Sequence, residues 1–311
     1  MPLPDFPIHP EQFPRQGSQG GIRVREDTLH SDHRGKEKKA IRKRASKALE
    51  KLQEPLSKLL EPEEVVLYVT RAQAPAGWFE QLTLGWIIYY ITGTTLVFTN
   101  RRLLHFLVKS NGAWKRSVRS LRWGDLSEAK VKGFLLSPTL QLHYRNGNKE
   151  FYWGLRRDDS KKIKVLLAAI LPAATGEGSP AQAMISLCPS CRATLTVGTY
   201  QCSQCFLAFK DETTMVRRSL LIPGGGYFYT GNRFLGVMDF IVEGYLLLLV
   251  LILVLSAFGV FSDPLAEPGE DSLPPAGAFV TASIFAAVLA VEKWMTIHHC
   301  RRFIREFIPT K

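Results

Sequence analysis

Four of the five cysteines stand in two matched pairs, Cys188-x-x-Cys191 and Cys202-x-x-Cys205, with ten residues between the pairs. Two such pairs at short separation form the ligand pattern of one tetrahedral Zn²⁺ site, with a thiolate at each corner. Four thiolates leave no open coordination position, so this zinc would be structural rather than catalytic. In an oxidising compartment the same residues would instead form disulfides. The location of the pairs therefore decides their chemistry.

Two long apolar segments follow the cysteine pairs. Residues 240–261 read FIVEGYLLLLVLILVLSAFGVF with Glu243 as their one charge, and about 20 apolar residues suffice to span a bilayer. Residues 277–297 are richer in alanine and carry Glu292 and Lys293 near their end. We expect a membrane hairpin over residues 215–307, with spans at about 240–261 and 277–297. For the second segment, a half-buried helix lying on the first span is the alternative.

Basic residues around these segments predict their orientation. The loop at 262–276 holds four acidic residues and no lysine or arginine, whereas arginines flank the hairpin on both sides. Such basic flanks stay on the cytoplasmic side of a membrane. We therefore expect an integral protein of the cytoplasmic membrane, with both termini cytoplasmic and the 262–276 loop outside. Because the cytosol keeps thiols reduced, this orientation favours a zinc site over disulfides.

A glycine-rich turn precedes the first apolar segment. Pro223, Gly224, Gly226, Tyr229 and Gly231 give the pattern Pro-Gly-x-Gly-x-x-Tyr-x-Gly. It resembles the opening signature of a family of small two-helix membrane hairpins, over about residues 215–300. The family implies no particular activity. Glycines at this spacing permit a tight turn and a close approach of helices, so the pattern fits either an interfacial turn or an oligomerisation or partner motif.

The cysteine pairs and their surroundings, residues 185–212, resemble a zinc ribbon. The resemblance implies a structural Zn²⁺ with four ligands: Cys188, Cys191, Cys202 and Cys205. The residues between the pairs, RATLTVGTYQ, predict a small hairpin around Gly198, and metal binding would supply most of the folding energy. Ribbons often carry glycine after the second cysteine of a pair, where this chain has Arg192 and Phe206. A rubredoxin-like iron site and a redox dithiol are the alternatives, and Cys300 is either palmitoylated or without special role.

Residues 62–172 have the pattern of several strands followed by one helix. Runs of β-branched and aromatic residues predict strands at 64–70, 93–99, 102–108, 139–144 and 150–153. Apolar residues at helical spacing predict a closing helix over 158–171. Thr99-Asn-Arg-Arg102, Trp123-Gly-Asp-Leu126 and the Asn146-Gly147 turn resemble bacterial PH-like domains, also likened to GRAM domains. The expected fold class is therefore α+β: a PH-like β-domain with a capping helix, a small zinc ribbon and an α-helical transmembrane hairpin.

Two stretches of this part of the chain leave the assignment open. Residues 82–98 carry no charge, so they form either a strand, which their threonine-rich second half favours, or a third span. Residues 173–184 are expected to be a linker between the PH-like domain and the ribbon.

Positive charge is concentrated in the N-terminal part. Residues 1–174 hold 30 Lys and Arg against 17 Asp and Glu, a net +13, and the remainder holds 10 against 11. Residues 34–60 are predicted to form a basic helix with a thin apolar face, and the polar, proline-rich residues 1–33 to be disordered. A basic helix beside a membrane segment suits the anionic lipid of the cytoplasmic leaflet. A merely solvated helix and a nucleic-acid contact are the alternatives.

No catalytic motif accompanies these elements, since the sequence has no phosphate loop, nucleophile elbow or His-Glu-x-x-His. We therefore expect a non-enzymatic, membrane-anchored, zinc-binding interaction or scaffold protein, whose residues 34–172 contact a protein or anionic lipid. The alternatives are a membrane-tethered regulator that binds nucleic acid and a small transport component. Nucleic acid is disfavoured because Arg192 is the single basic residue between Cys188 and Cys205. For transport, Glu243 and Glu292 are the acidic candidates within the spans.

Overall fold

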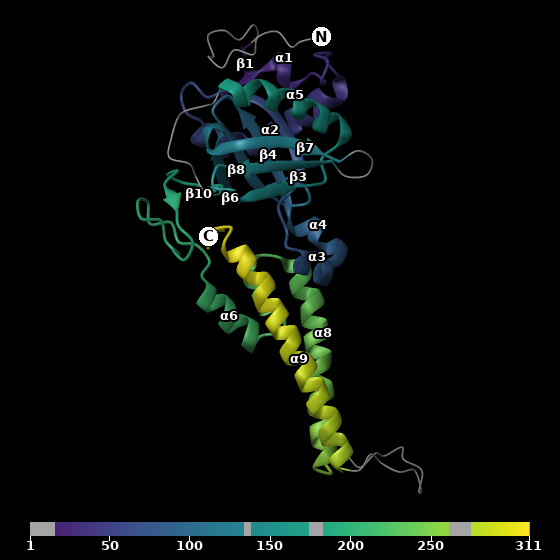
Figure 1. Ribbon diagram of the computed structural model, residues 1–311. Coiled ribbons are helices and arrows are strands. Elements are labelled where there is room, and N and C mark those ends of the chain that lie inside the picture. Colours follow the sequence, from purple (N-terminus) through teal and green to yellow (C-terminus); the bar gives the residue numbers. More distant parts are fainter. Residues whose placement is uncertain (1–15, 134–137, 174–182, 261–274, 311) are drawn as a thin grey trace. The chain divides into compact units, whose positions relative to one another are not determined.

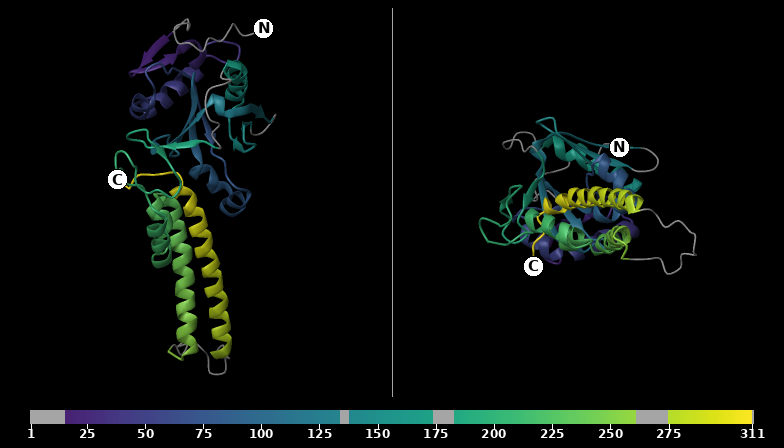
Figure 2. Two further views of the ribbon diagram at one scale, coloured as in Figure 1. Left: turned by 60° about the vertical axis from the view of Figure 1, so that its left-hand side comes forward. Right: turned by 90° about the horizontal axis from the view of Figure 1, so that it is seen from below.

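The computed structural model describes residues 16–133, 138–173, 183–260 and 275–310. The chain divides into two compact units, Met1–Ala208 with Lys311 (unit 1) and Phe209–Thr310 (unit 2). Unit 1 combines strands and helices, and unit 2 is helical (Figures 1 and 2). Most of the predicted linker at 173–184 and most of the predicted loop at 262–276 lie outside the described residues.

An antiparallel meander forms the centre of unit 1. Its strands are β3 (Val66–Gln73), β4 (Gly93–Thr99), β5 (Arg102–Val108) and β6 (Trp114–Arg122). Nearly every residue of β4 and β5 is buried, which explains why apolar and β-branched residues predominate in both strands. The strands predicted at 93–99 and 102–108 are thereby confirmed. Short strands extend both edges: β1 (Gln16–Gln19) and β2 (Ile22–Arg25) beyond β3, and β10 (Ile185–Leu187) and β11 (Thr194–Leu195) beyond β6.

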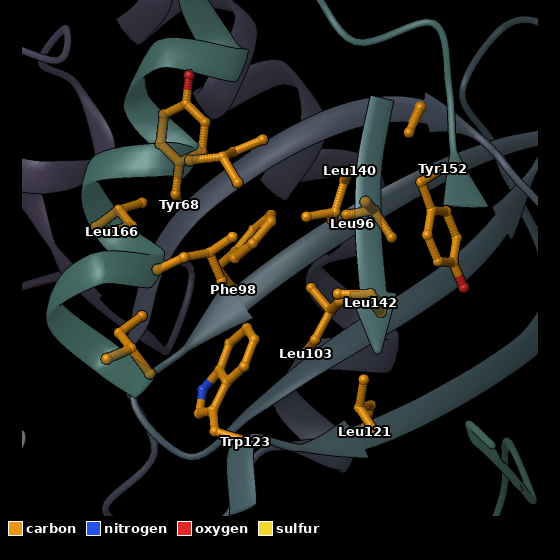
Figure 3. Packing of buried hydrophobic residues seen from close by; sticks show 14 of the residues in the cluster. Tyr68, Leu96, Phe98, Leu103, Leu121, Trp123, Leu140, Leu142, Tyr152 and Leu166 are labelled. Atoms are coloured by element: carbon orange, nitrogen blue, oxygen red, sulfur yellow. The ribbon is translucent and has the colours of Figure 1, made fainter. Parts of the chain in front are cut away.

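A second, three-stranded antiparallel sheet covers one face of the meander. It consists of β7 (Leu126–Lys132), β8 (Thr139–Tyr144) and β9 (Lys149–Tyr152), and every second residue of β8 is buried. Helix α5 (Arg157–Ala173) closes the same core through Leu166 and its neighbours. Phe98 and Trp123 stack at a centroid distance of 6.0 Å in this core (Figure 3). The predicted closing helix is therefore present, and it packs on the same hydrophobic core as β4.

Helix α2 (Lys39–Leu59) packs on the opposite face of the meander. Alternate strand residues point to opposite faces, and Val97, Phe106 and Val118 meet the apolar side of α2. This helix is the basic helix predicted at 34–60, but its buried face is broader than the thin one expected. It includes Ile41, Ala45, Leu49, Leu52, Pro55, Leu56 and Leu59. The basic helix is thus an integral part of the domain and keeps its charged side exposed.

The prediction of disorder is wrong for residues 16–33, whereas residues 1–15 lie outside the described part. This segment forms β1, β2 and the short helix α1 (Glu26–Leu29), and it buries Ile22, Val24 and Leu29. Val24 pairs with Val66 of β3 in parallel register. Three apolar residues in a polar segment are a weak local signal, and only the contact with a distant strand makes the segment ordered.

The uncharged segment 82–98 is neither a continuous strand nor a third spanning helix. Residues 78–91 form α3 (Trp78–Leu84), a 3₁₀ turn (Gly85–Ile87) and α4 (Ile88–Ile91). The chain then enters β4, whose threonines lie buried in the sheet. The β-branched half of the segment is therefore a strand, as its composition favours.

The Thr99-Asn-Arg-Arg102 motif forms a buried hydrogen-bond network at the β4–β5 turn. Arg102 donates from Nε to Glu64 Oε1 at 2.9 Å and from Nη2 to Glu64 Oε2 at 2.7 Å. Thr99 Oγ1 donates to Glu64 Oε1 at 2.7 Å, and Asn100 Oδ1 accepts from Val65 N at 2.9 Å. The Glu64 side chain is completely buried. The motif therefore ties this turn to the start of β3.

Unit 2 contains two long helices, α8 (Arg233–Ala257) and α9 (Pro275–Ile304), which run antiparallel and pack along each other (Figure 2). Both are long and apolar enough to cross a membrane, with mean hydropathies of 2.6 and 1.7 in their most apolar windows. Only 6% and 11% of those windows are buried inside the protein. Most of the apolar window of α9 is therefore not covered by the described residues. Both helices begin before the predicted spans.

The glycine-rich turn packs two short helices against this pair. They are α6 (Glu212–Leu221) and α7 (Gly225–Thr230). Gly224 has φ +66°, and a Cβ there would overlap the carbonyl oxygen of Gly236 on α8. A Cβ on Gly226 would overlap the hydroxyl of Ser219 and lie 3.1 Å from the sulfur of Cys300. The glycines therefore permit close packing among α6, α7, α8 and α9.

Replacing Gly224 with alanine should open this packing. The left-handed backbone alone costs a side chain about 1–3 kcal/mol, and the overlap with Gly236 adds to that cost. We expect faster maleimide labelling of Cys300, which is fully buried, when the full chain is warmed in detergent and analysed by mass spectrometry. Gly244→Ala is the matched control, because a Cβ there meets nothing within 4 Å. Equal labelling rates in the two variants would contradict the steric role.

Candidate metal centre

The four predicted ligands come together at one end of unit 1. Cys188 follows β10 directly, and Cys191 closes the first turn, whereas Cys202 and Cys205 belong to a second turn. Cys188 and Cys202 are buried and the other two are partly exposed. One sulfur from each residue lies within 4.8 Å of all the others. The structure therefore assembles the cluster that the spacing predicts.

The two turns have the same hydrogen bonds. In the first, Arg192 N donates to Cys188 O at 3.0 Å and Cys188 N donates to Ala193 O at 2.8 Å. In the second, Phe206 N donates to Cys202 O at 3.1 Å and Cys202 N donates to Leu207 O at 3.0 Å. This repetition gives both cysteine pairs the same local geometry, so two sulfurs from each turn face a common point.

Arg192 and Phe206, which stand where ribbons often have glycine, adopt the backbone conformation that glycine favours. Their φ angles are +67° and +57°, which is the left-handed region that glycine adopts without strain. The chain therefore keeps the turn that glycine would favour and accepts a side chain there, at a cost on the order of 1 kcal/mol per residue. The Phe206 side chain is 70% exposed, so it gains little from burial in return.

Two of the sulfur separations are longer than a disulfide bond and close to those of metal ligation. Sγ atoms lie 3.5 Å apart in the pair Cys188 and Cys205, and 3.4 Å apart in the pair Cys191 and Cys202. A disulfide needs about 2.05 Å, and all five cysteines are free. Zn–S bonds of about 2.3 Å in a tetrahedron place sulfurs roughly 3.8 Å apart. In these two pairs, a Zn²⁺ ion would need the sulfurs to move apart only slightly.

Backbone N–H groups also stabilise thiolates in this cluster. Burial by itself raises the pKa of Cys202, but N–H groups of Gln204 and Cys205 outweigh it and bring that pKa to about 6. At Cys188 burial dominates and raises the pKa to about 12 despite the N–H groups of Ser190 and Cys191. Together with hydrogen bonds from the Cys191 and Cys205 side chains, the N–H groups around Cys202 favour its thiolate form, which is the form that binds a metal.

The ribbon segment is anchored to the sheet rather than folded by itself. Strand β10 pairs antiparallel with β6, with Ser186 opposite Arg119. Strand β11 returns to pair with β10, with Leu195 opposite Ser186. The small hairpin predicted within 192–201 does not form; β11, within this segment, pairs instead with the preceding strand β10. A turn follows at Gly198, whose φ is +94°. Strand pairing therefore holds the cysteine segment on the sheet independently of any metal.

The other residues considered from sequence do not join this cluster. Cys300 is buried in unit 2, beside Gly226. Glu243 and Glu292 also lie in unit 2, where they meet a third carboxylate, Asp239, within 4.8 Å. The sequence reading named the two glutamates separately and missed Asp239. The signal was available, since Asp239 and Glu243 are four residues apart and share one helix face.

Comparison with known proteins adds little to this geometry. No protein-family model matches the chain, and no curated protein matches it. One similar solved structure is the C-terminal domain of an unknown protein from Leishmania infantum, with 10% identity, 42% of this chain and 98% of that chain covered, and a TM-score of 0.26. A likeness at that score supports no argument about fold or function, so function is inferred from the chain itself.

Proposed function

We propose that this protein is a membrane-anchored, zinc-binding interaction or scaffold protein of the cytoplasmic membrane. The observation that carries the proposal is the exposure of α8 and α9, whose apolar windows remain almost entirely uncovered within the chain. Exposed apolar faces of this size require a bilayer or a partner, and backbone satisfied within helices suits a bilayer. The arginines at the hairpin ends support an orientation with both termini in the cytoplasm.

Zn²⁺ is the proposed metal of the four-cysteine cluster. Four cysteine sulfurs within 4.8 Å of one another favour zinc over the harder cations, which prefer oxygen ligands. When bound, zinc would act as a structural crosslink between the two turns. Cys188, Cys191, Cys202 and Cys205 would hold it and leave no site for substrate. The same donor set supports an interaction module rather than a hydrolytic centre.

Unit 1 is proposed to be a PH-like domain that contacts anionic lipid. The order of its strands, followed by α5 as a closing helix, supports that resemblance. Along α2, Lys39, Lys43 and Lys47 are exposed and spaced four residues apart, so they form one stripe. A hairpin in the same chain would keep this stripe near the membrane surface, where each lysine contributes about 1 kcal/mol toward anionic lipid.

Lysine reactivity in nanodiscs tests this function. With the full chain in anionic nanodiscs, amine acetylation of Lys39, Lys43 and Lys47 should be about fivefold slower than in zwitterionic nanodiscs, since 1 kcal/mol corresponds to that factor. High salt should remove the difference. Lys149, an exposed lysine outside α2, serves as the internal control. Equal rates in both lipids would overturn lipid contact and leave a protein partner as the target of unit 1.

A further inference from the structure

Three carboxylates meet inside the helical unit. Asp239 and Glu243 stand one turn apart on α8, and Glu292 stands on the facing side of α9. One oxygen from each lies within 4.8 Å of the other two. Asp239 and Glu292 are linked further by Thr296, whose hydroxyl lies 3.3 Å from Asp239 and 2.9 Å from Glu292. The two helices therefore build one acidic cluster within their contact.

The positive charge in contact with this cluster neutralises only part of it. Lys293 Nζ donates to Glu243 Oε2 at 2.6 Å, and that oxygen also accepts from Gly224 N at 2.8 Å. Lys293 also donates to the carbonyl oxygen of Ser219 at 2.5 Å. One ammonium thus faces three carboxyl groups, so ionisation of all three would leave two negative charges without a partner in a low-dielectric helical unit. Uncompensated buried charge is costly, so a positive ligand or protons must accompany it.

The cluster also contains oxygens that no described donor reaches. The Glu243 side chain is fully buried, and its Oε1 atom has no hydrogen-bond donor within the described residues. The same holds for Oε2 of Glu292, while its Oε1 accepts from Thr296. A buried acceptor without a donor is destabilising, and each of these two oxygens is on a carboxylate of the cluster.

We infer that Asp239, Glu243 and Glu292 bind a divalent cation of the hard, oxygen-preferring class, such as Mg²⁺ or Mn²⁺. A cation of charge +2 cancels the two remaining negative charges and gives the orphan oxygens a partner. The three ligand oxygens lie within 4.8 Å of one another, so a small closing movement of the side chains would let them share one ion at the Mg²⁺–oxygen distance of about 2.0–2.1 Å. Asp239 is only half-buried, so it leaves a route for the ion.

The site would fasten the glycine-rich turn to the hairpin. Glu243 holds Gly224 through one oxygen, and the cation would engage the other. Charge balance at Glu243 thereby links α7, α8 and α9 in one network. The inference is independent of the ribbon zinc and of lipid contact, because its residues all belong to unit 2.

Manganese titration followed by electron paramagnetic resonance tests the site. The full chain in detergent, with zinc bound, should bind one equivalent of Mn²⁺ and lower the signal of free Mn²⁺ by that amount. Asp239→Asn with Glu292→Gln should weaken that binding by roughly 100-fold or more, because affinity follows the number of charged ligands. Glu212→Gln, which removes an exposed carboxylate of the same unit, should bind as the wild type does. Cys191→Ser should also retain the Mn²⁺ site, which separates it from the ribbon.

Two results would overturn the inference. The first is a wild-type chain that binds no stoichiometric Mn²⁺, a measurement that holds even if the double variant fails to fold. The second is unchanged binding in a folded double variant. Infrared bands of protonated carboxyl groups in metal-free wild type, lost in Glu292→Gln, would accompany the first result if shared protons neutralise the cluster instead.

Discussion

Replacing Cys188 with serine should abolish stoichiometric Zn²⁺ binding and release the ribbon from the sheet. Structural zinc in small modules contributes about 10–16 kcal/mol of apparent binding free energy. Removing a direct thiolate ligand should cost more than the 10–100-fold in affinity that loss of an outer partner costs. Two measurements report the loss directly. Inductively coupled plasma emission spectroscopy gives the zinc content, and the sulfur-to-metal charge-transfer absorption of the Co²⁺-substituted protein reports thiolate ligation.

The structural consequence should be confined to one edge of unit 1. Strand β10 meets β6 through three residue pairs and contributes Leu187 to the core, whereas the centre of the sheet is held by other residues. Hydrogen exchange should therefore accelerate at residues 185–208 and stay slow in β4 and β5. Cys300→Ser is the control, because it removes a buried cysteine outside the cluster. If that variant lost zinc as well, or if Cys188→Ser kept it, the assignment of ligands would be wrong.

The cysteine cluster was predictable because its information is local. Two turns of four residues place their sulfurs by backbone geometry alone, so spacing in sequence determines spacing in space. The carboxylate cluster is different. Asp239 and Glu243 share a helix face by their spacing, but Glu292 joins them only through the register of α9 against α8. That register depends on packing at the glycine-rich turn, which no local pattern reveals.

The same distinction explains the strands. Strands buried on both faces, such as β4 and β5, are rich in apolar and β-branched residues and were predicted with correct bounds. Strands β6 and β7 were missed, because they read WKRSVRSLR and LSEAKVK and keep charged residues on a partly exposed side. Hydrogen bonds to neighbouring strands, rather than their own composition, make these segments extended.

Arg102→Ala removes the guanidinium group and should lower the free energy of unfolding of unit 1 by about 3–5 kcal/mol, because Glu64 would be left charged and buried without its partner. Arg101→Ala is a neighbouring control. Arg101 pairs with Glu61 and Glu63 at the surface, where all three side chains are exposed, so its loss should cost about 0–1 kcal/mol. The urea dependence of proteolysis of unit 1, in the full chain in detergent, measures both values.

A double variant separates the worth of the ion pair from the penalty of breaking it. Glu64→Leu with Arg102→Met removes both charges and keeps apolar bulk at the β4–β5 turn. Because desolvation offsets much of the attraction in a buried pair, this variant should lose far less stability than Arg102→Ala alone. Thr99 Oγ1 keeps an acceptor in either case, since it also lies 2.8 Å from Arg102 O. A double variant as unstable as Arg102→Ala would instead mean that the bidentate pair itself holds the turn to β3, and that the motif contributes net stability to the fold.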